Sequence, residues 1–303
     1  MIGLGVRAAN AGLEILDLPQ PRQPEAGELI LDVITAGIGP WDALLHTGVW
    51  DVNLILPAAL GVEAVGRVAK TSPDETEFRI GDLVLVHEAP LPGGSGTWAQ
   101  QVLVQSAHVA RLPENLTPAL GAALPVAGLT AQQTLDELQV QPSTRLLVVG
   151  ASGPTASLAV QLAHLRGAEV VAGAGPAHAD KLRALGAHDV IDTHIEGWAD
   201  KTAYRFDAVL IAATGTAEDA MSLIVKGGRL CSITSDAPDS AAGVTTSNLY
   251  LQPDGQMLAE LAALAAAGKL GLEVQTTPIE DGIDIANQVA AGRSGGVKHV
   301  LEL

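Results

Sequence analysis

The stretch Leu146–Ala163, LLVVGASGPTASLAVQLA, decides how this chain of 303 residues is interpreted. An apolar run, Leu146–Val149, stops at Gly150, and a loop of small residues follows it. Apolar residues then recur at helical spacing, at Leu158, Val160, Leu162 and Leu165. The pattern predicts a strand, a tight turn and a helix. The backbone N–H groups of such a turn, together with the helix N-terminus, can bind a pyrophosphate.

The turn matches the dinucleotide-binding fingerprint only in part. The fingerprint is Gly-x-Gly-x-x-Gly or Ala, whereas this chain has Ala-x-Gly-x-x-Ala from residue 151 onward. Gly153 is the one glycine in register, Gly150 lies one position ahead, and Ala156 is an allowed third member. Two interpretations stay open at this point: a nucleotide-binding turn, and an ordinary strand–helix turn of an α/β protein.

The composition describes a chain that can bury a large core. Hydrophobic residues make up 48% and charged residues 17%, and the length suits two ordinary domains. The 34 acidic and 17 basic residues give a net charge of −17, which argues against nucleic acid or an anionic membrane surface as a partner. We interpret the acidity as a source of solubility. No membrane span or secretory signal is apparent, so we expect a cytoplasmic protein.

The chain has one cysteine, Cys231, in the strand-like segment GGRLCSI. A disulfide within the chain is therefore impossible, and so is a cysteine-rich structural zinc site. Cys231 is either a reactive thiol or, as is commoner in such a run, a buried structural residue.

The first hundred residues predict a strand meander that closes partly on itself. Short apolar or alternating runs, separated by Gly, Pro and Asp, lie at Ile2–Val6, Leu13–Leu16, Leu29–Ile34, Ala64–Val68, Leu83–Val86 and Trp98–Val104. Pro40–Leu45 predicts a single helical turn.

The remainder of the chain predicts helices and then an alternation of strands and helices. Expected helices are Thr117–Leu124, Leu129–Leu138, Thr155–Arg166, Ala177–Leu185, Ala217–Val225, Gln256–Ala267 and Ile283–Ala291. Expected strands are Leu146–Val149, Glu169–Ala172, Asp189–Ile191, Ala208–Ala212, Arg229–Thr234 and Val297–Leu301. The alternation is typical of a parallel sheet that is covered on both faces.

The end of the second strand of this alternation bears on the choice of cofactor. NAD-binding folds place an acidic residue here to bind the ribose 2′-hydroxyl, but Val170–Pro176 contains none. A 2′-phosphate is therefore tolerated, which favours NADP. His178, Lys181 and Arg183 follow closely and could supply positive charge, or they could form a solvated helix face.

Eight segments, in this order and at this spacing, carry a family resemblance. They are Ala36–Gly48, Leu56–Val68, Phe78–Val86, Leu124–Leu135, Leu182–Asp192, Lys226–Leu230, Leu251–Leu261 and Val297–Leu303. Together they resemble the zinc-independent quinone oxidoreductase and enoyl reductase branch of the medium-chain dehydrogenase/reductase superfamily. The resemblance covers nearly the whole chain.

The resemblance implies an α/β fold in which a Rossmann doubly wound parallel sheet is inserted in a GroES-like, β-rich catalytic domain. The expected catalytic domain comprises residues 1–117 and 273–303, and the dinucleotide-binding domain residues 118–272. The ligand is expected between them, and a homodimer is possible by family likeness. The zinc-binding relatives place a histidine where this chain has Val62, and no cysteine precedes Cys231. Since His46 and Glu63 cannot form a three-ligand site alone, we expect no metal.

The resemblance also implies the site residues. Phosphate contacts are expected from the turn residues Gly150, Ser152, Gly153, Pro154 and Thr155, with Pro154 lacking an N–H. Ribose and 2′-phosphate contacts are expected from Gly173, His178 and Lys181, and the nicotinamide side from Thr214, Thr234, Leu251 and Lys298. Thr130 is expected either to contact the nicotinamide ribose or to take part in helix capping.

The expected substrate pocket departs from the family pattern. Its walls are Trp41, Asp42, His46 and Trp50, but Gly39 replaces the family's asparagine and Trp50 its tyrosine. The proton is therefore expected from water or from the substrate. Asp42 could orient a ligand or water, or it could cap the short helix near Pro40.

Two functions follow as hypotheses. The first is an NADPH-dependent oxidoreductase that passes hydride to a quinone or to an α,β-unsaturated carbonyl compound, a small hydrophobic substrate. The second, prompted by the lost asparagine and tyrosine and by the altered loop, is a cofactor-binding protein with a redox-responsive or structural role and little catalysis.

Overall fold

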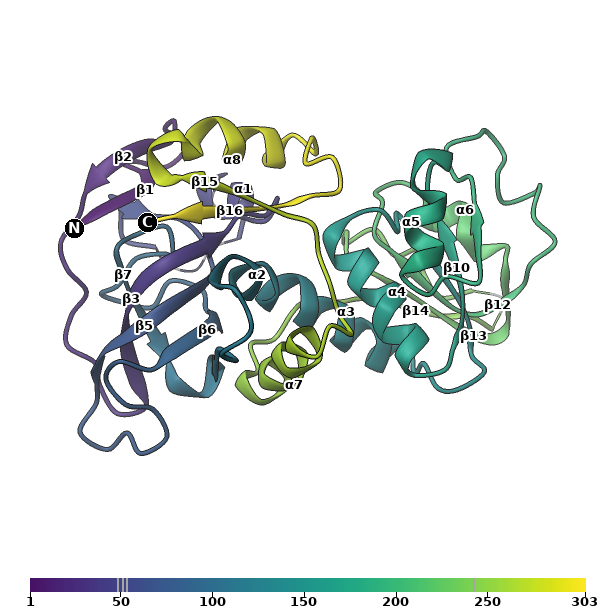
Figure 1. Cartoon of the computed structure of the whole chain (residues 1–303). Helices are drawn as coiled ribbons and strands as arrows, with labels where there is room; N and C mark the ends of the chain where they lie inside the picture. The colour runs from purple at the N-terminus through teal and green to yellow at the C-terminus, as the bar shows by residue number, and fades with distance from the viewer. Residues whose placement is uncertain (48, 51, 53, 242) are drawn as a thin grey trace. The chain divides into compact units, whose positions relative to one another are not determined.

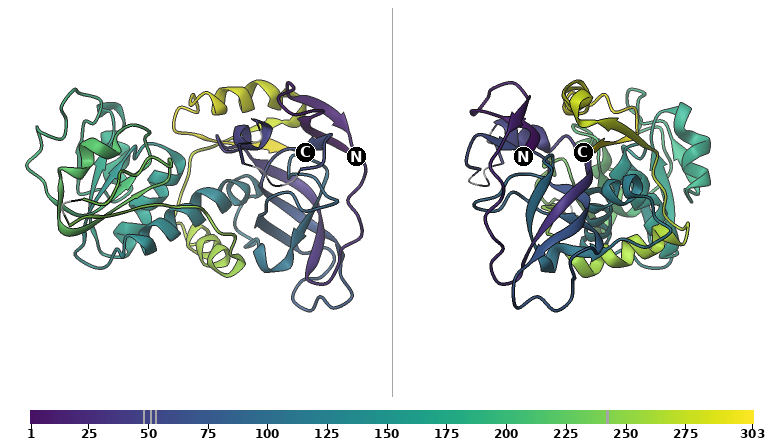
Figure 2. Two further views of the ribbon diagram at one scale, coloured as in Figure 1. Left: turned by 180° about the vertical axis from the view of Figure 1, so that it is seen from behind. Right: turned by 60° about the vertical axis from the view of Figure 1, so that its left-hand side comes forward.

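The computed structural model describes residues 1–47, 49–50, 52, 54–241 and 243–303. The chain folds as two compact units (Figure 1). Unit 1 comprises Met1–Val126, Pro253–Gly268 and Leu272–Leu303, and unit 2 comprises Ala127–Gln252 and Lys269–Gly271. Both chain termini belong to unit 1, as the further views in Figure 2 also show.

Unit 1 is built on a mostly antiparallel sheet. Its strand order is β15-β16-β3-β5-β6-β8, and β7 pairs with β3 off this path. The strands are β3 (Glu28–Gly37), β5 (Glu63–Thr71), β6 (Leu83–His87), β7 (Gln101–Gln105), β8 (Val109–Arg111), β15 (Val274–Pro278) and β16 (Lys298–Glu302). A second sheet joins β1 (Ile2–Val6) to β2 (Glu14–Asp17) and β4 (Ala58–Ala59). The sheet therefore combines strands from both ends of the chain.

The helices of unit 1 are α1 (Asp42–Thr47), α2 (Pro118–Ala123), η1 (Ser106–His108), α7 (Gly255–Ala266), η3 (Ile279–Asp281) and α8 (Gly282–Ala290). Helix α2 packs on β3 and β5. Two residues define the N-terminus of α2. The Thr117 side chain accepts a hydrogen bond from the Leu120 amide, and Pro118 occupies the first helical position.

The β-rich start of the chain is confirmed, with differences in detail. The expected strand Trp98–Val104 is wrong at its beginning, since β7 starts at Gln101. Trp98 instead exchanges hydrogen bonds with the backbone of Leu4 and Leu60, and its indole donates to the Gly37 carbonyl at 2.9 Å. The strands β4, β8 and β15 were not expected, because each is short or polar.

Unit 2 contains a six-stranded sheet whose neighbouring strands are all parallel. The order β11-β10-β9-β12-β13-β14 runs outward in both directions from β9. The strands are β9 (Arg145–Val149), β10 (Glu169–Gly173), β11 (Asp189–Ile191), β12 (Phe206–Ile211), β13 (Ile224–Ser232) and β14 (Thr245–Asn248). This is the doubly wound order, in which the direction of winding reverses between β9 and β12. The predicted Rossmann fold class is confirmed.

The helices of unit 2 are α3 (Pro125–Glu137), α4 (Pro154–Leu165), η2 (Pro176–His178), α5 (Ala179–Ala184) and α6 (Ala217–Met221). The first two residues of α3 belong to unit 1. Helix α4 contacts β9 and β10, α5 contacts β11, and α6 contacts β13. The expected helix Ala217–Val225 is too long. It ends at Met221 because Ile224 already pairs with Phe206 as the first residue of β13.

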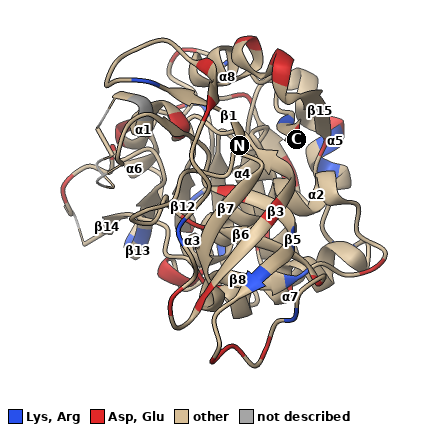
Figure 3. Ribbon diagram, turned by 90° about the vertical axis from the view of Figure 1, so that its left-hand side faces the viewer, with Lys and Arg blue, Asp and Glu red and all other residues tan. Residues whose placement is uncertain are grey.

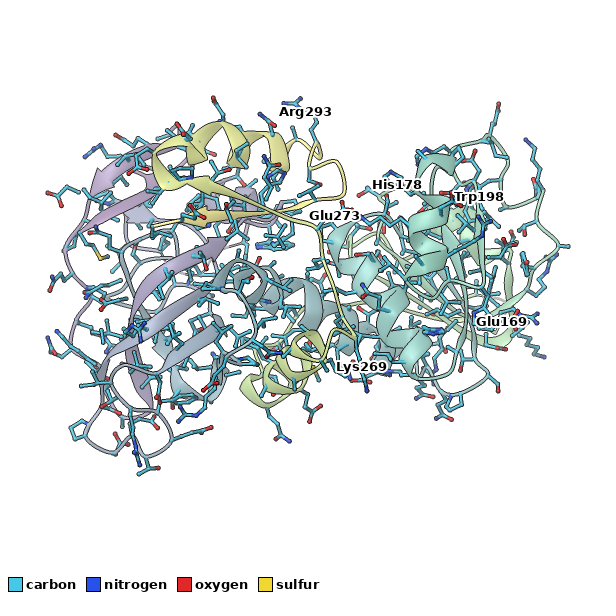
Figure 4. All side chains as sticks on the ribbon, in the orientation of Figure 1. Glu169, His178, Trp198, Lys269, Glu273 and Arg293 are labelled. Atoms are coloured by element: carbon cyan, nitrogen blue, oxygen red, sulfur yellow. The ribbon has the colours of Figure 1, made fainter. Side chains whose placement is uncertain are left out.

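Two glutamines fix the ends of unit 2 in the same way. Gln133 on α3 donates to the Gln252 carbonyl at 2.7 Å and accepts from the Gln252 amide at 3.0 Å. Gln161 on α4 makes the same pair of bonds with Gly271, both at 2.9 Å. Lys269 and Glu273, labelled in Figure 4, lie two residues before and two residues after Gly271. Each side-chain amide thus pairs with the backbone where the chain leaves unit 2.

Charge and helix character are two further properties of the chain. Acidic side chains are spread over many elements, as Figure 3 shows in red, in keeping with the net charge of −17. Among the described residues, no helix combines the length and the apolar character needed to cross a membrane.

Candidate functional site: the turn after β9 and a buried charge cluster

The turn between β9 and α4 lies at the carboxyl edge of the sheet in unit 2. Gly150 has a φ of +79°, and a Cβ there would come within 3.0 Å of Ala213 Cβ, in the turn after β12. The amides of Gly150 and Ala151 both donate to the Gly173 carbonyl, at 2.9 and 3.0 Å. Gly150 therefore shapes the turn, and its N–H is not available to a phosphate.

Three other amides of the turn, those of Ser152, Thr155 and Ala156, have no acceptor in the described part of the structure, whereas the Gly153 amide donates to the Gly150 carbonyl at 3.2 Å. Thr155 and Ala156 occupy the second and third positions of α4, where an N–H has no partner within the helix. Ser152 is half-buried, and its amide has no acceptor among the described residues. Pro154 is the first residue of α4. Proline has no backbone N–H, so the first helical position offers no donor to a ligand.

Gly153 is open on the side where a ligand would approach. Its φ of −71° and ψ of 156° are accessible to any residue, and a Cβ there would meet nothing closer than the Gly150 carbonyl at 3.6 Å. The fold itself therefore does not require glycine at this position. A pyrophosphate lying on the turn would require it, because the backbone must approach the phosphate closely. The turn fits a dinucleotide by this test.

The end of β10 contains no acidic side chain. Gly173 ends the strand, and a Cβ there would lie 2.7 Å from Thr193 Cγ2. His178 and Lys181 are half-buried in η2 and α5, directly after it. Figure 4 labels His178 at this edge and Glu169 at the opposite end of the same strand. Residues 170–176, at and beyond the end of β10, thus present no carboxylate at this edge.

The next part of the same edge is formed by the turns after β12 and β13. Thr214 is exposed in the first turn, Thr234 is half-buried in the second, and Leu251 is half-buried beyond β14. Asp236 connects the two turns, because it accepts a hydrogen bond from the Gly215 amide at 2.8 Å and one from the Thr234 hydroxyl at 2.7 Å. Asp236 was not among the site residues predicted from the sequence.

Unit 1 holds a cluster of buried charged groups. The Lys298 ammonium donates to a Glu63 carboxylate oxygen and, at 2.8 Å, to the Ile38 carbonyl. It also lies 4.6 Å from the centre of the Trp41 ring, a cation–π contact. Since Lys298 and Glu63 are only 3% and 0% exposed, this pair is desolvated. Glu63, Ile38 and Trp41 thus surround the ammonium, and the nicotinamide contact of Lys298 stays a prediction.

The other Glu63 oxygen accepts from the Val126 amide at 2.9 Å, so this carboxylate joins β5 to the start of α3. Burial raises the pKa of Glu63, while Lys298 and the Val126 amide act in the opposite direction. A Cβ at Gly37 would lie 2.5 Å from the Glu63 carboxylate. Glycine at that position leaves the space that the side chain occupies.

Asp42 is the third titratable member of the cluster. Its carboxyl accepts from the Gly39 amide at 2.8 Å, so Asp42, the first residue of α1, binds the backbone that leads into the helix. A role toward a ligand stays a prediction. Burial raises the pKa of Asp42 to about 8, against opposing effects of the Gly39 amide and of Lys298. The carboxyl is mostly neutral at pH 7.

Three other predicted residues have different outcomes. The side chain of His46 lies outside the described part of the structure, as do residues 48, 51 and 53. Trp50 is half-buried, and its amide donates to the Leu44 carbonyl. Thr130 lies inside α3, because the helix begins at Pro125 rather than at Leu129, so the capping interpretation of Thr130 is wrong.

The comparisons with known proteins agree with this architecture. The description "alcohol dehydrogenase GroES-like domain" matches residues 25–114, and "zinc-binding dehydrogenase" matches residues 185–298. The chain belongs to the medium-chain dehydrogenase/reductase superfamily. A crystal structure of an alcohol dehydrogenase superfamily protein from Novosphingobium aromaticivorans superimposes with a TM-score of 0.89 and 28% identity, covering 100% of this chain and 99% of that one.

Curated relatives of the superfamily are similar in sequence. The NADPH-dependent alkenal/one oxidoreductase of Arabidopsis thaliana is 30% identical over 80% of this chain and 63% of its own length. The chloroplast envelope quinone oxidoreductase homolog of the same plant is 33% identical over 68% and 65%. The pikromycin polyketide synthase component PikAII of Streptomyces venezuelae is 32% identical over 92% of this chain, which spans only 8% of that protein.

Proposed function

We propose that this chain is an NADPH-dependent reductase that transfers hydride to a quinone or to an α,β-unsaturated carbonyl compound without zinc. The observation that carries the proposal is the turn at Gly153, which is open toward a ligand and flanked by unpaired amides. A nicotinamide cofactor supplies the hydride when bound. The chain contributes binding, orientation and the exclusion of water.

The preference for NADPH is supported by the surroundings of Gly173. A carboxylate at the end of β10 would repel a 2′-phosphate, and Gly173-Ala174-Gly175 supplies none. His178 and Lys181 follow on η2 and α5. The name of the Arabidopsis alkenal/one oxidoreductase includes NADPH dependence, which agrees with this choice.

The substrate class is proposed from the names of the relatives, which include an alkenal/one oxidoreductase and a quinone oxidoreductase homolog. Both acceptors are conjugated, so they take hydride without a Lewis acid when a proton is available. Asp42, Trp50, His46 and Thr130 are the proposed residues near the reacting groups. Water or the substrate itself supplies the proton, because Trp50 has no acidic proton to give.

Zinc independence is supported by the side chains at the family's ligand positions. Val62, at the position of the histidine ligand, is buried and apolar, and the adjacent Glu63 is bound to the Lys298 ammonium. Elemental analysis of the purified protein after dialysis against zinc should find far less than one zinc per chain. One zinc per chain, removed by a chelator with loss of activity, would contradict this part of the proposal.

The experiment that tests the proposal is a fluorescence titration with NADPH and NADH, followed by oxidation assays with a quinone and an enone. The decisive variant is Gly153→Val, because a Cβ at this position meets no atom of the protein closer than 3.6 Å but would lie where the backbone must approach a bound pyrophosphate. We expect unfolding by urea to be unchanged and NADPH affinity to fall at least tenfold. Gly12→Val is the matched control, since a Cβ at Gly12 meets nothing within 4 Å and Gly12 lies outside the turn.

Each outcome has a defined meaning. Absence of NADPH binding at millimolar concentration would reject both the enzyme and the alternative cofactor-binding protein. Tight binding without turnover of several acceptors would favour the alternative. A strong preference for NADH would overturn the cofactor choice alone.

A further inference from the structure

Asp236 stands out as a half-buried carboxylate with a full set of donors at the carboxyl edge of the unit 2 sheet. One oxygen accepts from the hydroxyls of Ser232 and Thr234, at 2.6 and 2.7 Å. The other accepts from the Gly215 amide at 2.8 Å. Two turns, separated in sequence by α6 and β13, are thus joined through a single side chain.

Both turns are in conformations that need support. Gly215 has a φ of +80°, and Ser235, a residue with a side chain, has a φ of +61°. Such a conformation costs roughly 1 kcal/mol or more in a residue other than glycine. The Ser232 hydroxyl also accepts from the Thr234 amide at 3.0 Å, which closes the second turn on itself. The carboxylate is the common acceptor of this network.

The network lies next to the turn between β9 and α4. Gly150 of that turn lies against Ala212 and Ala213, which precede Gly215 by three and two residues. In a doubly wound sheet the glycine turn and the second strand hold the adenosine half of a dinucleotide, so the strands beyond the reversal hold the nicotinamide half. The turns after β12 and β13 lie on that second side.

The state of the carboxyl excludes a role as proton source. Burial acts to raise the pKa of Asp236, but the hydrogen bonds from Ser232, Gly215 and Thr234 together lower it. The group is therefore an ionised acceptor with its donors already in place. Ser232 is 0% exposed and reaches no ligand directly.

We propose that Asp236 is a positioning residue, which holds the turns after β12 and β13 in the shape that binds the nicotinamide half of the cofactor. This inference rests on the proposed function of the turn at Gly153. It assigns to Asp236 no direct contact with the cofactor. Its effect passes through the Gly215 amide and through the orientation of Thr234.

The test compares two ligands that share the adenosine half. NADPH contains both halves, whereas 2′,5′-ADP lacks the nicotinamide half. In Asp236→Asn and Asp236→Ala we expect NADPH affinity to fall at least fivefold, more in the alanine variant, while 2′,5′-ADP affinity changes less than twofold. Titration calorimetry of the full chain measures both. Asp239→Asn is the control, an exposed acid nearby for which no hydrogen bond is found among the described residues.

A second variant covers the case in which the Asp236 variants do not fold. Ser232→Ala removes one donor to the carboxylate from a position that cannot touch a ligand, and we expect a two- to fivefold loss for NADPH alone. An equal loss for both ligands, or no loss for NADPH, would overturn the inference. A wild-type protein that binds neither ligand would instead reject the proposed function.

Discussion

Asp42 is a buried acid whose proton contributes to stability. Its pKa is raised to about 8 in the folded protein, chiefly by burial, above a usual value of about 3.9. Below pH 4 both the folded and the unfolded chain hold the proton. As pH rises toward 8, the unfolded chain releases it first, so stability falls by up to about 1.4 kcal/mol per pH unit.

The first prediction concerns Asp42→Asn, which keeps an acceptor for the Gly39 amide but cannot ionise. Urea unfolding at pH 5, 6.5 and 8 should show the variant gaining stability relative to the wild type as pH rises. Asp74→Asn, a change at an exposed acid, should show no such trend. Parallel pH curves for Asp42→Asn and the wild type would mean that Asp42 is ionised in the folded protein.

The second prediction concerns the pair Glu63 and Lys298. Lys298→Met leaves the buried carboxylate without its cation and should cost about 3–5 kcal/mol in the free energy of unfolding. Glu63→Gln combined with Lys298→Met removes both charges and should recover most of this loss. A double-mutant cycle by urea unfolding measures the coupling. Additive effects of the two changes would show that the ion pair is energetically unimportant.

At the scale of elements, the chain segments that leave unit 2 are fixed by side chains rather than by strands. Gln161 is 6% exposed. Its side-chain amide donates hydrogen bonds to the Ser157 carbonyl on its own helix and to the Gly271 carbonyl. A buried amide group that loses its partner costs about 1–3 kcal/mol. The segment Lys269–Gly271 therefore depends on a residue of α4.

The third prediction follows for Gln161→Met, which preserves approximate volume and removes both hydrogen bonds to Gly271. Hydrogen exchange of the backbone amides at residues 269–271 should accelerate at least tenfold, while β9 and β10 stay protected. Gln133→Met should have the same effect at Gln252 and none at Gly271. Faster exchange throughout unit 2 in either variant would show that these contacts hold the whole unit together.

Elements differed in how well the sequence predicted them. Strand β9 and helix α4 were predicted to within one residue at each end, because a strong apolar run meets small turn residues there. Helix α6 was extended too far, because the apolar residues Leu223, Ile224 and Val225 continue past Met221 and only pairing with β12 shows that Ile224 belongs to a strand. Strand β14 was missed, since Thr245–Asn248 is polar and its strand character comes from its neighbour β13.

At the scale of the whole molecule, long-range pairing is what the sequence could not predict. The fold class, a doubly wound parallel sheet inserted in a β-rich domain, followed from alternation and from family likeness. Glu63 was considered only as an incomplete metal ligand, and Lys298 as a cofactor contact. Their mutual bond joins positions 235 residues apart, which no local pattern encodes. Asp236 was missed for a related reason, because its Gly215 partner belongs to another turn.

The position of Lys298 also has a consequence for the order in which the chain folds during synthesis. Its partners Glu63 and Ile38 emerge from the ribosome 235 and 260 residues earlier. Until β16 arrives, Glu63 can be buried only as an uncompensated or protonated acid, which is costly. Unit 2 is nearly contiguous, from Ala127 to Gln252, so it can fold while the first-made segment still lacks its cation. Unit 1, which contains Met1–Val126 and Leu272–Leu303, can therefore finish folding only after unit 2 has been synthesised.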